Sequence, residues 1–223
     1  MTGKLTIAVM QPYFFPYAGY FRLMAASDIF VVFDDVQFAR RGRVHRCEMT
    51  PGHWLTLPVA PMPFDALIKD LRWANDARTT LDKRLAVFGL PGQARTPAAE
   101  QINGHLTGAL GDVTDFLEEG LRLTADALQL RPDVVRSSRL GIDPALRAQA
   151  RVIAIVQALG GQRYINAPGG RSLYSRDAFQ QAGIDLRFLV PYAGRFPHIL
   201  PALLGNGLAD LRDDIRNTCQ LAP

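Results

Sequence analysis

The chain has 223 residues, of which 48% are hydrophobic, and a formal net charge of +4. This length suits one domain with a full hydrophobic core. No run of about 18 apolar residues is present, and the N-terminus lacks the regions of a secretory signal, so we expect a cytoplasmic protein without membrane insertion.

The cysteines and histidines do not predict a metal site. Cys47 and Cys219 are far apart and are expected to be plain thiols in a reducing compartment. The four histidines form no ligand spacing either. The sequence identifies no cofactor.

The front of the chain predicts a ligand-binding loop. An apolar strand near residues 5–10 is followed by positions 12–17, which are all aromatic or proline. A plain connector would use Gly, Ser or Asn there. A helix over 21–27 and a strand over 29–34 complete a unit that places ligands at the carboxyl ends of parallel strands. We therefore expect Gln11, Tyr13, Tyr17 and Tyr20 to line a pocket with Asp35.

Two charged groups follow the second strand. Strand alternation predicts that Asp34 and Asp35 point to opposite faces, whereas Asp35 and Gln37 share one face. Capping of a turn by both aspartates is the alternative. Four arginines lie between positions 40 and 46 and form either a solvated loop or an anion grip that uses Arg41 and Arg46.

The middle of the chain predicts mostly helices. A strand is expected near 54–59, and a strand is slightly favoured over 66–73. Helices are expected over 76–88, 97–110 and 112–130, the last with one apolar face. We read residues 76–131 as a helical insertion.

The last third returns to alternating strands and helices. A short strand from Val134 ends at Ser137 and Ser138, whose hydroxyls predict either a phosphate contact or a turn. Asp143 and Pro144 predict the start of a helix that ends at Gly160. A strand over 163–166, a glycine loop over 167–172, a helix over 175–182, a strand over 185–190 and two short helices broken at 205–207 follow.

The glycine loop predicts a second wall of the pocket. Backbone amides of such a loop can cradle an anion. Its candidate ligand contacts, together with those of the preceding strand, are Tyr164, Asn166, Gly169 and Gly170.

These patterns predict an α/β fold with a mostly parallel sheet, arranged as a three-layer single domain over 1–223 with the helical insertion. Residues 11–35 resemble the front of nucleotidyltransferase-type folds. In those folds a His-x-Gly-His pair holds nucleotide phosphates, and here both histidines are replaced, by Tyr17 and Tyr20. Because tyrosine stays uncharged at neutral pH, the outline supports the fold more than it supports nucleotidyl transfer.

A more specific resemblance covers nearly the whole chain. Met10–Phe21, Phe33–Phe38 and Trp54–Val59 resemble the WbqC-like protein family, and the similarity resumes at Ser138, over 151–161 and over 164–184. The resemblance implies a role in making or decorating a sugar or small metabolite, as a transferase, in polysaccharide or natural-product biosynthesis.

Two departures from the family pattern bear on the substrate. The family usually has an aromatic residue in an Arg-Gly-Trp-x-x-Arg stretch where this chain has Arg43. Leu200–Gly207 lacks the Ser and Asp that the family tends to show there. If those residues hold substrate in relatives, this chain accepts a different substrate or has lost activity.

Two functions follow from these observations. In the first, the chain is a transferase with a nucleotide-sugar, acyl or aminoacyl donor. A carrier or a transfer RNA is an open alternative for delivering the acyl or aminoacyl donor. Gln11 and the tyrosines would orient the ligand, and Asp35 would act as base or orienter. In the second, the chain is a non-catalytic binding or scaffold protein of such a pathway. General nucleic-acid binding is weaker, because the other basic residues are dispersed.

Overall fold

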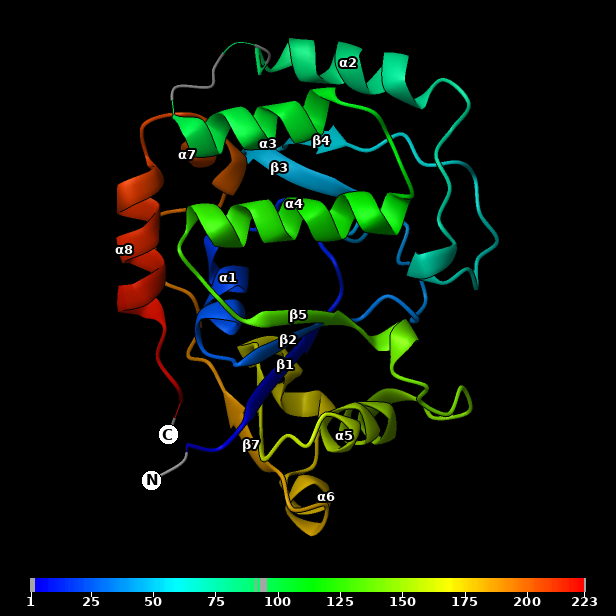
Figure 1. The fold of residues 1–223 in the computed structure, drawn as a ribbon, viewed down its shortest axis with the longest axis vertical. Helices are drawn as coiled ribbons and strands as arrows, with labels where there is room; N and C mark the ends of the chain where they lie inside the picture. The colour runs from blue at the N-terminus through cyan, green and yellow to red at the C-terminus, as the bar shows by residue number, and fades with distance from the viewer. Residues whose placement is uncertain (1–2, 91, 93–95, 223) are drawn as a thin grey trace.

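A five-stranded parallel sheet runs through the middle of the molecule (Figure 1). The structure is a computed structural model that describes residues 3–90, 92 and 96–222. The strands lie in the order β5-β2-β1-β6-β7. Their bounds are Thr6–Met10 (β1), Ile29–Val32 (β2), Asp133–Arg136 (β5), Arg163–Asn166 (β6) and Asp185–Phe188 (β7).

The strand order reverses once, next to β1. The chain passes outward from β1 to β2 and β5, then returns to the other side of β1 for β6 and β7. In register, Ile7 faces Ile29 of β2 on one side and Tyr164 of β6 on the other. The loops that follow β1 and β6 therefore leave neighbouring strands at the same edge of the sheet, which we call the carboxyl edge.

Helices cover both faces of the sheet, which confirms the predicted three-layer α/β class. Because both faces are covered, the central strands are apolar at consecutive positions. Ala8, Phe30 and Val32 belong to the core beneath α1 and α4, whereas Ile7, Val9 and Val31 belong to the core beneath α5 and α6. The helix bounds are Ala18–Ala25 (α1), Val113–Ala127 (α4), Ala148–Ala158 (α5) and Arg176–Gln181 (α6).

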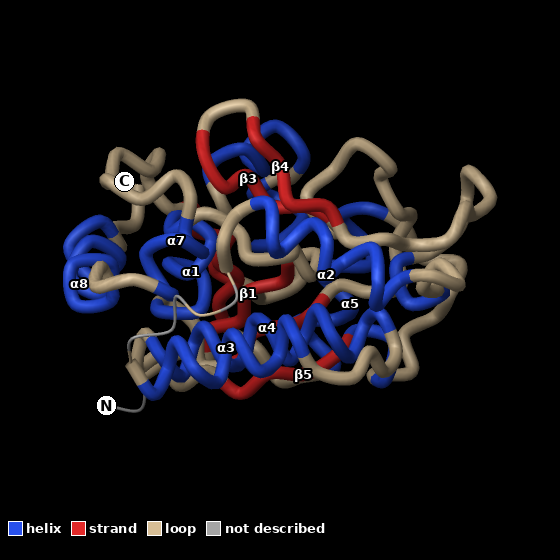
Figure 2. Tube along the Cα trace, turned by 90° about the horizontal axis from the view of Figure 1, so that it is seen from above, coloured by secondary structure: helices blue, strands red, loops and turns tan. Residues whose placement is uncertain are grey.

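Further elements extend the layer that contains α1 and α4. They share its hydrophobic core. A two-stranded hairpin stands on the side of the molecule away from α4 (Figure 2). These elements are β3 (Arg46–Thr50), β4 (His53–Thr56), α2 (Ala77–Val87), α3 (Pro97–Thr107), α7 (Ile199–Leu204) and α8 (Leu208–Thr218).

Two predicted elements differ in the structure. The strand expected over 66–73 is a 3-10 turn at Ile68–Asp70, because backbone bonds to chain on both sides hold it and leave only isolated bridges at Leu67 and Trp73. The helix expected from Asp143 begins at Ala148. Asp143 closes a separate turn: its side chain accepts a hydrogen bond from the Ala145 amide and its carbonyl accepts one from the Leu146 amide. Ala148, at the first position of α5, has a φ of 46°, so a right-handed helix cannot run through it from Asp143.

A buried arginine ties the two ends of the chain together. Arg22 of α1 is 1% exposed. Its guanidinium donates to the carbonyls of Thr218 (2.7 Å) and Val190 (3.0 Å) and lies 5.2 Å from the ring centre of Tyr192. A charge at this depth needs hydrogen-bond acceptors, and these carbonyls lie 196 and 168 residues away in sequence.

We predict that Arg22→Leu lowers the free energy of unfolding by about 3 kcal/mol, since it removes two charged hydrogen bonds worth roughly 1.5–3 kcal/mol each. Urea denaturation measures this. The control is Arg131→Leu, an exposed arginine paired with an exposed aspartate, which should cost less than about 1 kcal/mol. Equal losses for the two variants would contradict the role of Arg22.

Acid should destabilise the protein partly through His105. The ring stacks on Phe116 at 4.1 Å, and burial lowers its pKa to about 4. Between about pH 6.5 and pH 4, the unfolded chain therefore takes up a proton that the folded chain does not. The free energy of unfolding then decreases by up to about 1.4 kcal/mol for each unit by which the pH is lowered. His105→Gln should reduce the loss between pH 7 and pH 4.5, whereas exposed His53→Gln should leave it unchanged. The same loss in His105→Gln and the parent would refute this.

Candidate functional site

The carboxyl edge brings together the two loops that the sequence singled out. Gln11 directly follows β1, and Asn166 is the last residue of β6, which is the neighbouring strand. In open parallel sheets, ligands bind outside the carboxyl ends of the strands where the strand order reverses. This point in the fold is therefore the candidate site.

The tyrosines of the first loop pack closely. Tyr20 is 3% exposed, donates its hydroxyl proton to the Gln11 carbonyl (2.8 Å) and packs its ring against Tyr13. Tyr17 packs edge-on against Tyr192 at 5.6 Å. Burial raises the pKa of Tyr13, although the positive charge of Arg43 opposes the rise. Tyr20 thus holds the start of the loop, while Tyr13 and Tyr17 stay half-buried.

The second loop folds as a 3-10 turn, Pro168–Leu173. Asn166 is buried, and its side-chain oxygen accepts the amide proton of Ala167 (2.7 Å). A side chain at Gly170 would come within 2.4 Å of the side-chain nitrogen of Asn166 and would displace it, whereas Gly169 has open space around it. Tyr164 is not part of this loop. It is fully buried in the core that contains α5, with its ring stacked on Phe179.

Asp34 and Asp35 converge, contrary to the separation expected from strand alternation. The rule does not apply because β2 ends at Val32. The hydroxyl of Ser137 lies 3.1 Å from Asp34 and 2.6 Å from Asp35. Asp34 also accepts hydrogen bonds from the amide and the hydroxyl of Ser138, at 3.0 and 2.6 Å. Both hydroxyls therefore bind aspartates.

Asp35 carries an ion pair that the sequence did not predict. Its carboxylate accepts a hydrogen bond from the guanidinium of Arg151 on α5, and both side chains are less than 10% exposed. No spacing signal could have paired residues 116 positions apart. Gln37, expected beside Asp35, instead donates its amide proton to the Phe64 carbonyl (2.9 Å).

The arginine segment folds back on its own hairpin. Arg46 donates to the carbonyls of Arg41 and Gly42, and its guanidinium lies 4.5 Å from the ring centre of Trp54. Arg43 lies over the same ring at 5.1 Å. Arg41 is exposed. The sequence did not predict β3, because its only strand signal is the alternation of buried Cys47 and Met49 with charged neighbours.

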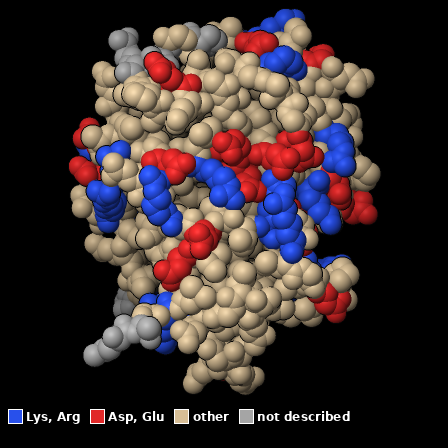
Figure 3. All heavy atoms as spheres, viewed as in Figure 1, with Lys and Arg blue, Asp and Glu red and all other residues tan. Residues whose placement is uncertain are grey.

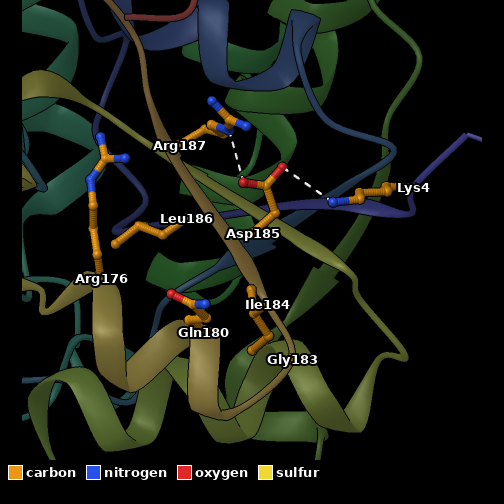
Figure 4. A pocket seen from close by; sticks show the side chains of 8 residues that line it. All are labelled: Lys4, Arg176, Gln180, Gly183, Ile184, Asp185, Leu186 and Arg187. Carbon is orange, nitrogen blue, oxygen red and sulfur yellow. Dashed lines mark hydrogen bonds and ion pairs between the residues drawn. The ribbon is translucent and has the colours of Figure 1, made fainter. Parts of the chain in front are cut away.

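Five cavities of the described chain are lined by residues outside the loops that follow β1 and β6. One of about 430 Å³ lies beside the amino end of β7, where Lys4 and Arg187 bind Asp185 (Figure 4). The pocket expected around Gln11, Tyr13, Tyr17 and Tyr20 therefore stays a prediction. Among residues 3–90, 92 and 96–222, no three His, Cys, Asp or Glu side chains are grouped to hold a metal ion. Within the same ranges, no helix is long and apolar enough to cross a bilayer.

Comparison with known proteins identifies the family. The sequence model of the WbqC-like protein family matches residues 11–198, so the chain belongs to this family. The protein named "Uncharacterized protein Rv1507c", from Mycobacterium tuberculosis, is 36% identical over 56 residues, which cover 24% of this chain and 24% of that protein. The aligned part thus spans about a quarter of that relative. No solved structure matches the chain.

We predict that the Asp35–Arg151 pair is coupled. Asp35→Asn should cost about 3 kcal/mol of unfolding free energy, because it leaves the buried Arg151 charge unmatched, and adding Arg151→Met should recover most of the loss. A double-mutant cycle in urea measures this coupling. Asp126→Asn, which breaks an exposed pair with Arg131, is the control and should cost less than about 1 kcal/mol. Additive losses at 35 and 151 would show that the two side chains act independently.

Proposed function

We propose that this member of the WbqC-like family is a transferase that binds an activated small molecule at the carboxyl edge, between β1 and β6. The observation that supports this most is the strand order, which reverses between these two strands. The polar, aromatic loop after β1 and the glycine loop after β6 both leave the sheet at this point.

Each loop has a separate role in the proposal. Gln11 and Tyr13 orient the ligand from the first loop, and Tyr17 stands beside them. The backbone of Gly169 and Gly170 holds an anionic group of the donor, since backbone amides suit phosphate and carboxylate. Asp35 is a positioning residue, because its carboxylate is held by the Arg151 guanidinium and the Ser137 hydroxyl.

The proposed reaction class is the one that the resemblance to the WbqC-like family implies. The donor is a nucleotide-sugar, an acyl donor or an aminoacyl donor, the last two delivered on a carrier or a transfer RNA. The acceptor is a sugar or small metabolite of polysaccharide or natural-product biosynthesis, in the cytoplasm. In each case the donor carries a phosphate or ester that backbone amides and Arg41 can stabilise.

One observation favours a second candidate function, a non-catalytic ligand-binding or scaffold protein. Asp34 and Asp35 both accept hydrogen bonds from other parts of the chain, namely from Ser137, Ser138 and Arg151. These contacts give both carboxylates a structural role at the end of β2. Binding without turnover is the behaviour that this arrangement supports.

A donor screen tests the proposal. The melting temperature is measured with nucleotides, nucleotide-sugars, acyl-CoA and aminoacyl-tRNA. A donor at 100 times its Kd stabilises by about 2.7 kcal/mol, which raises the melting temperature by about 5–10 °C in a chain of this size. Gln11→Ala should remove the shift, whereas Gln180→Ala, in the cavity at the amino end of β7, should keep it.

Three outcomes separate the functions. A shift together with a transferred group, detected by mass spectrometry on candidate acceptors, supports the transferase. A shift that needs Gln11 but yields no product supports the binding protein. If every donor class leaves the melting temperature unchanged, or if Gln11→Ala keeps the full shift, the proposed site is wrong.

A further inference from the structure

A small cavity lies between the loop that precedes β3 and the segment that follows β4. It has a volume of about 200 Å³. The Arg40 guanidinium closes one side by donating to the Met62 carbonyl on the opposite wall. Its lining residues are Phe38, Arg40, His45, Val59, Ala60, Pro61 and Met62.

The lining combines two nitrogen groups with apolar walls. Arg40 and His45 are its only titratable side chains, and no carboxylate is among the lining residues. The remaining lining is aliphatic, thioether or aromatic. Such a cavity favours a ligand that has one anionic group and a compact apolar body, because the guanidinium matches carboxylate and phosphate while the walls match hydrocarbon.

The charge around the cavity is unmatched. On the face that α4 and β5 present, acidic and basic side chains form adjacent rows (Figure 3), and ion pairs there join Arg136 to Asp115 and Glu118. In contrast, Arg40, Arg41, Arg43 and Arg46 form no ion pair with any described residue. Like charges that lack an acid repel one another, and a bound anion relieves this.

His45 is held in the wall without a polar anchor. Its Nδ1 is buried and has no hydrogen-bond partner in the described chain, and its ring packs edge-on against Phe38 at 5.1 Å. Burial lowers the pKa of His45, and the charges of Arg46 and Arg84 lower it further. The unpaired Nδ1 is therefore available to a polar group of a ligand in this cavity.

We propose that this cavity is a binding site for a small organic monoanion, with Arg40 and His45 facing the anionic group and Phe38, Val59 and Met62 enclosing the apolar body. The site is distinct from the one between β1 and β6. It does not depend on whether the protein transfers a group, since it is defined by binding alone.

Calorimetric titration of the whole chain with benzoate tests the site. Benzamide has the same shape without the charge, and inorganic phosphate has charge without the apolar body. We expect saturable binding of benzoate and at least about tenfold weaker binding of both analogues. In Arg40→Gln, the Kd for benzoate should be about tenfold higher. Arg72→Gln is the matched control. Its backbone carbonyl pairs with Ala60, but its side chain does not line the cavity.

A second variant covers the case in which Arg40→Gln fails to fold. Ala60→Phe fills the cavity without changing the charge, and it should abolish benzoate binding while melting cooperatively. Benzamide binding as tightly as benzoate would overturn the proposal. So would an equal loss in Arg40→Gln and Arg72→Gln, which would mean diffuse attraction to basic residues. Benzoate binding that survives Ala60→Phe would also overturn it.

Discussion

The burial of Asp34 is the constraint on which the carboxyl edge depends. The residue is 1% exposed, and a carboxylate at that depth must be matched by hydrogen-bond donors, which fill its acceptor positions in part. Ser137 and Ser138 supply these donors from the end of β5, while the backbone carbonyl of Asp34 accepts the amide proton of Lys69. The side chain of Asp34 thus ties the end of β2 to the end of β5, and its backbone ties the same point to the turn that follows the hairpin. Asp35 is then directed toward Arg151, so the same corner also reaches the α5 layer.

At the end of β2, the acidic groups have structural roles, and other groups remain available to a ligand. The acidic side chains that the sequence places at a strand end are used to hold strands and helices together. The polar groups left over lie in the loops after β1 and β6 and in the arginine segment before β3. A ligand at the carboxyl edge would therefore meet amides, tyrosines and guanidinium groups more than free carboxylates. Such a lining suits anionic ligands, and it is equally compatible with binding and with group transfer.

Local patterns were a good guide wherever the structure is local. The strands near 5–10, 29–34 and 163–166, the helices over 76–88 and 112–130 and the break at 205–207 all appear, because periodicity and capping residues specify them. The predictions were wrong or missing for segments whose conformation depends on residues far away in the sequence. The 68–70 turn is held by residues 34–38, and β3 exists because β4 pairs with it. The same holds for the contacts of the predicted site residues: the loops after β1 and β6 are where the sequence places them, whereas the pairing of Asp35 with the distant Arg151 had no local signal.

The sequence by itself determined the alternation of strands and helices, the burial of the central strands, the aromatic loop after β1 and membership of the WbqC-like family. These depend on residue type and spacing over fewer than about 20 positions, which is the range of hydrophobic periodicity. Only the tertiary structure decided the strand order, the convergence of Asp34 and Asp35 on Ser137 and the pairing of Asp35 with Arg151. Ser137 and Arg151 lie 102 and 116 residues from Asp35 in sequence. Their meeting is set by how the layers pack, which no local pattern encodes.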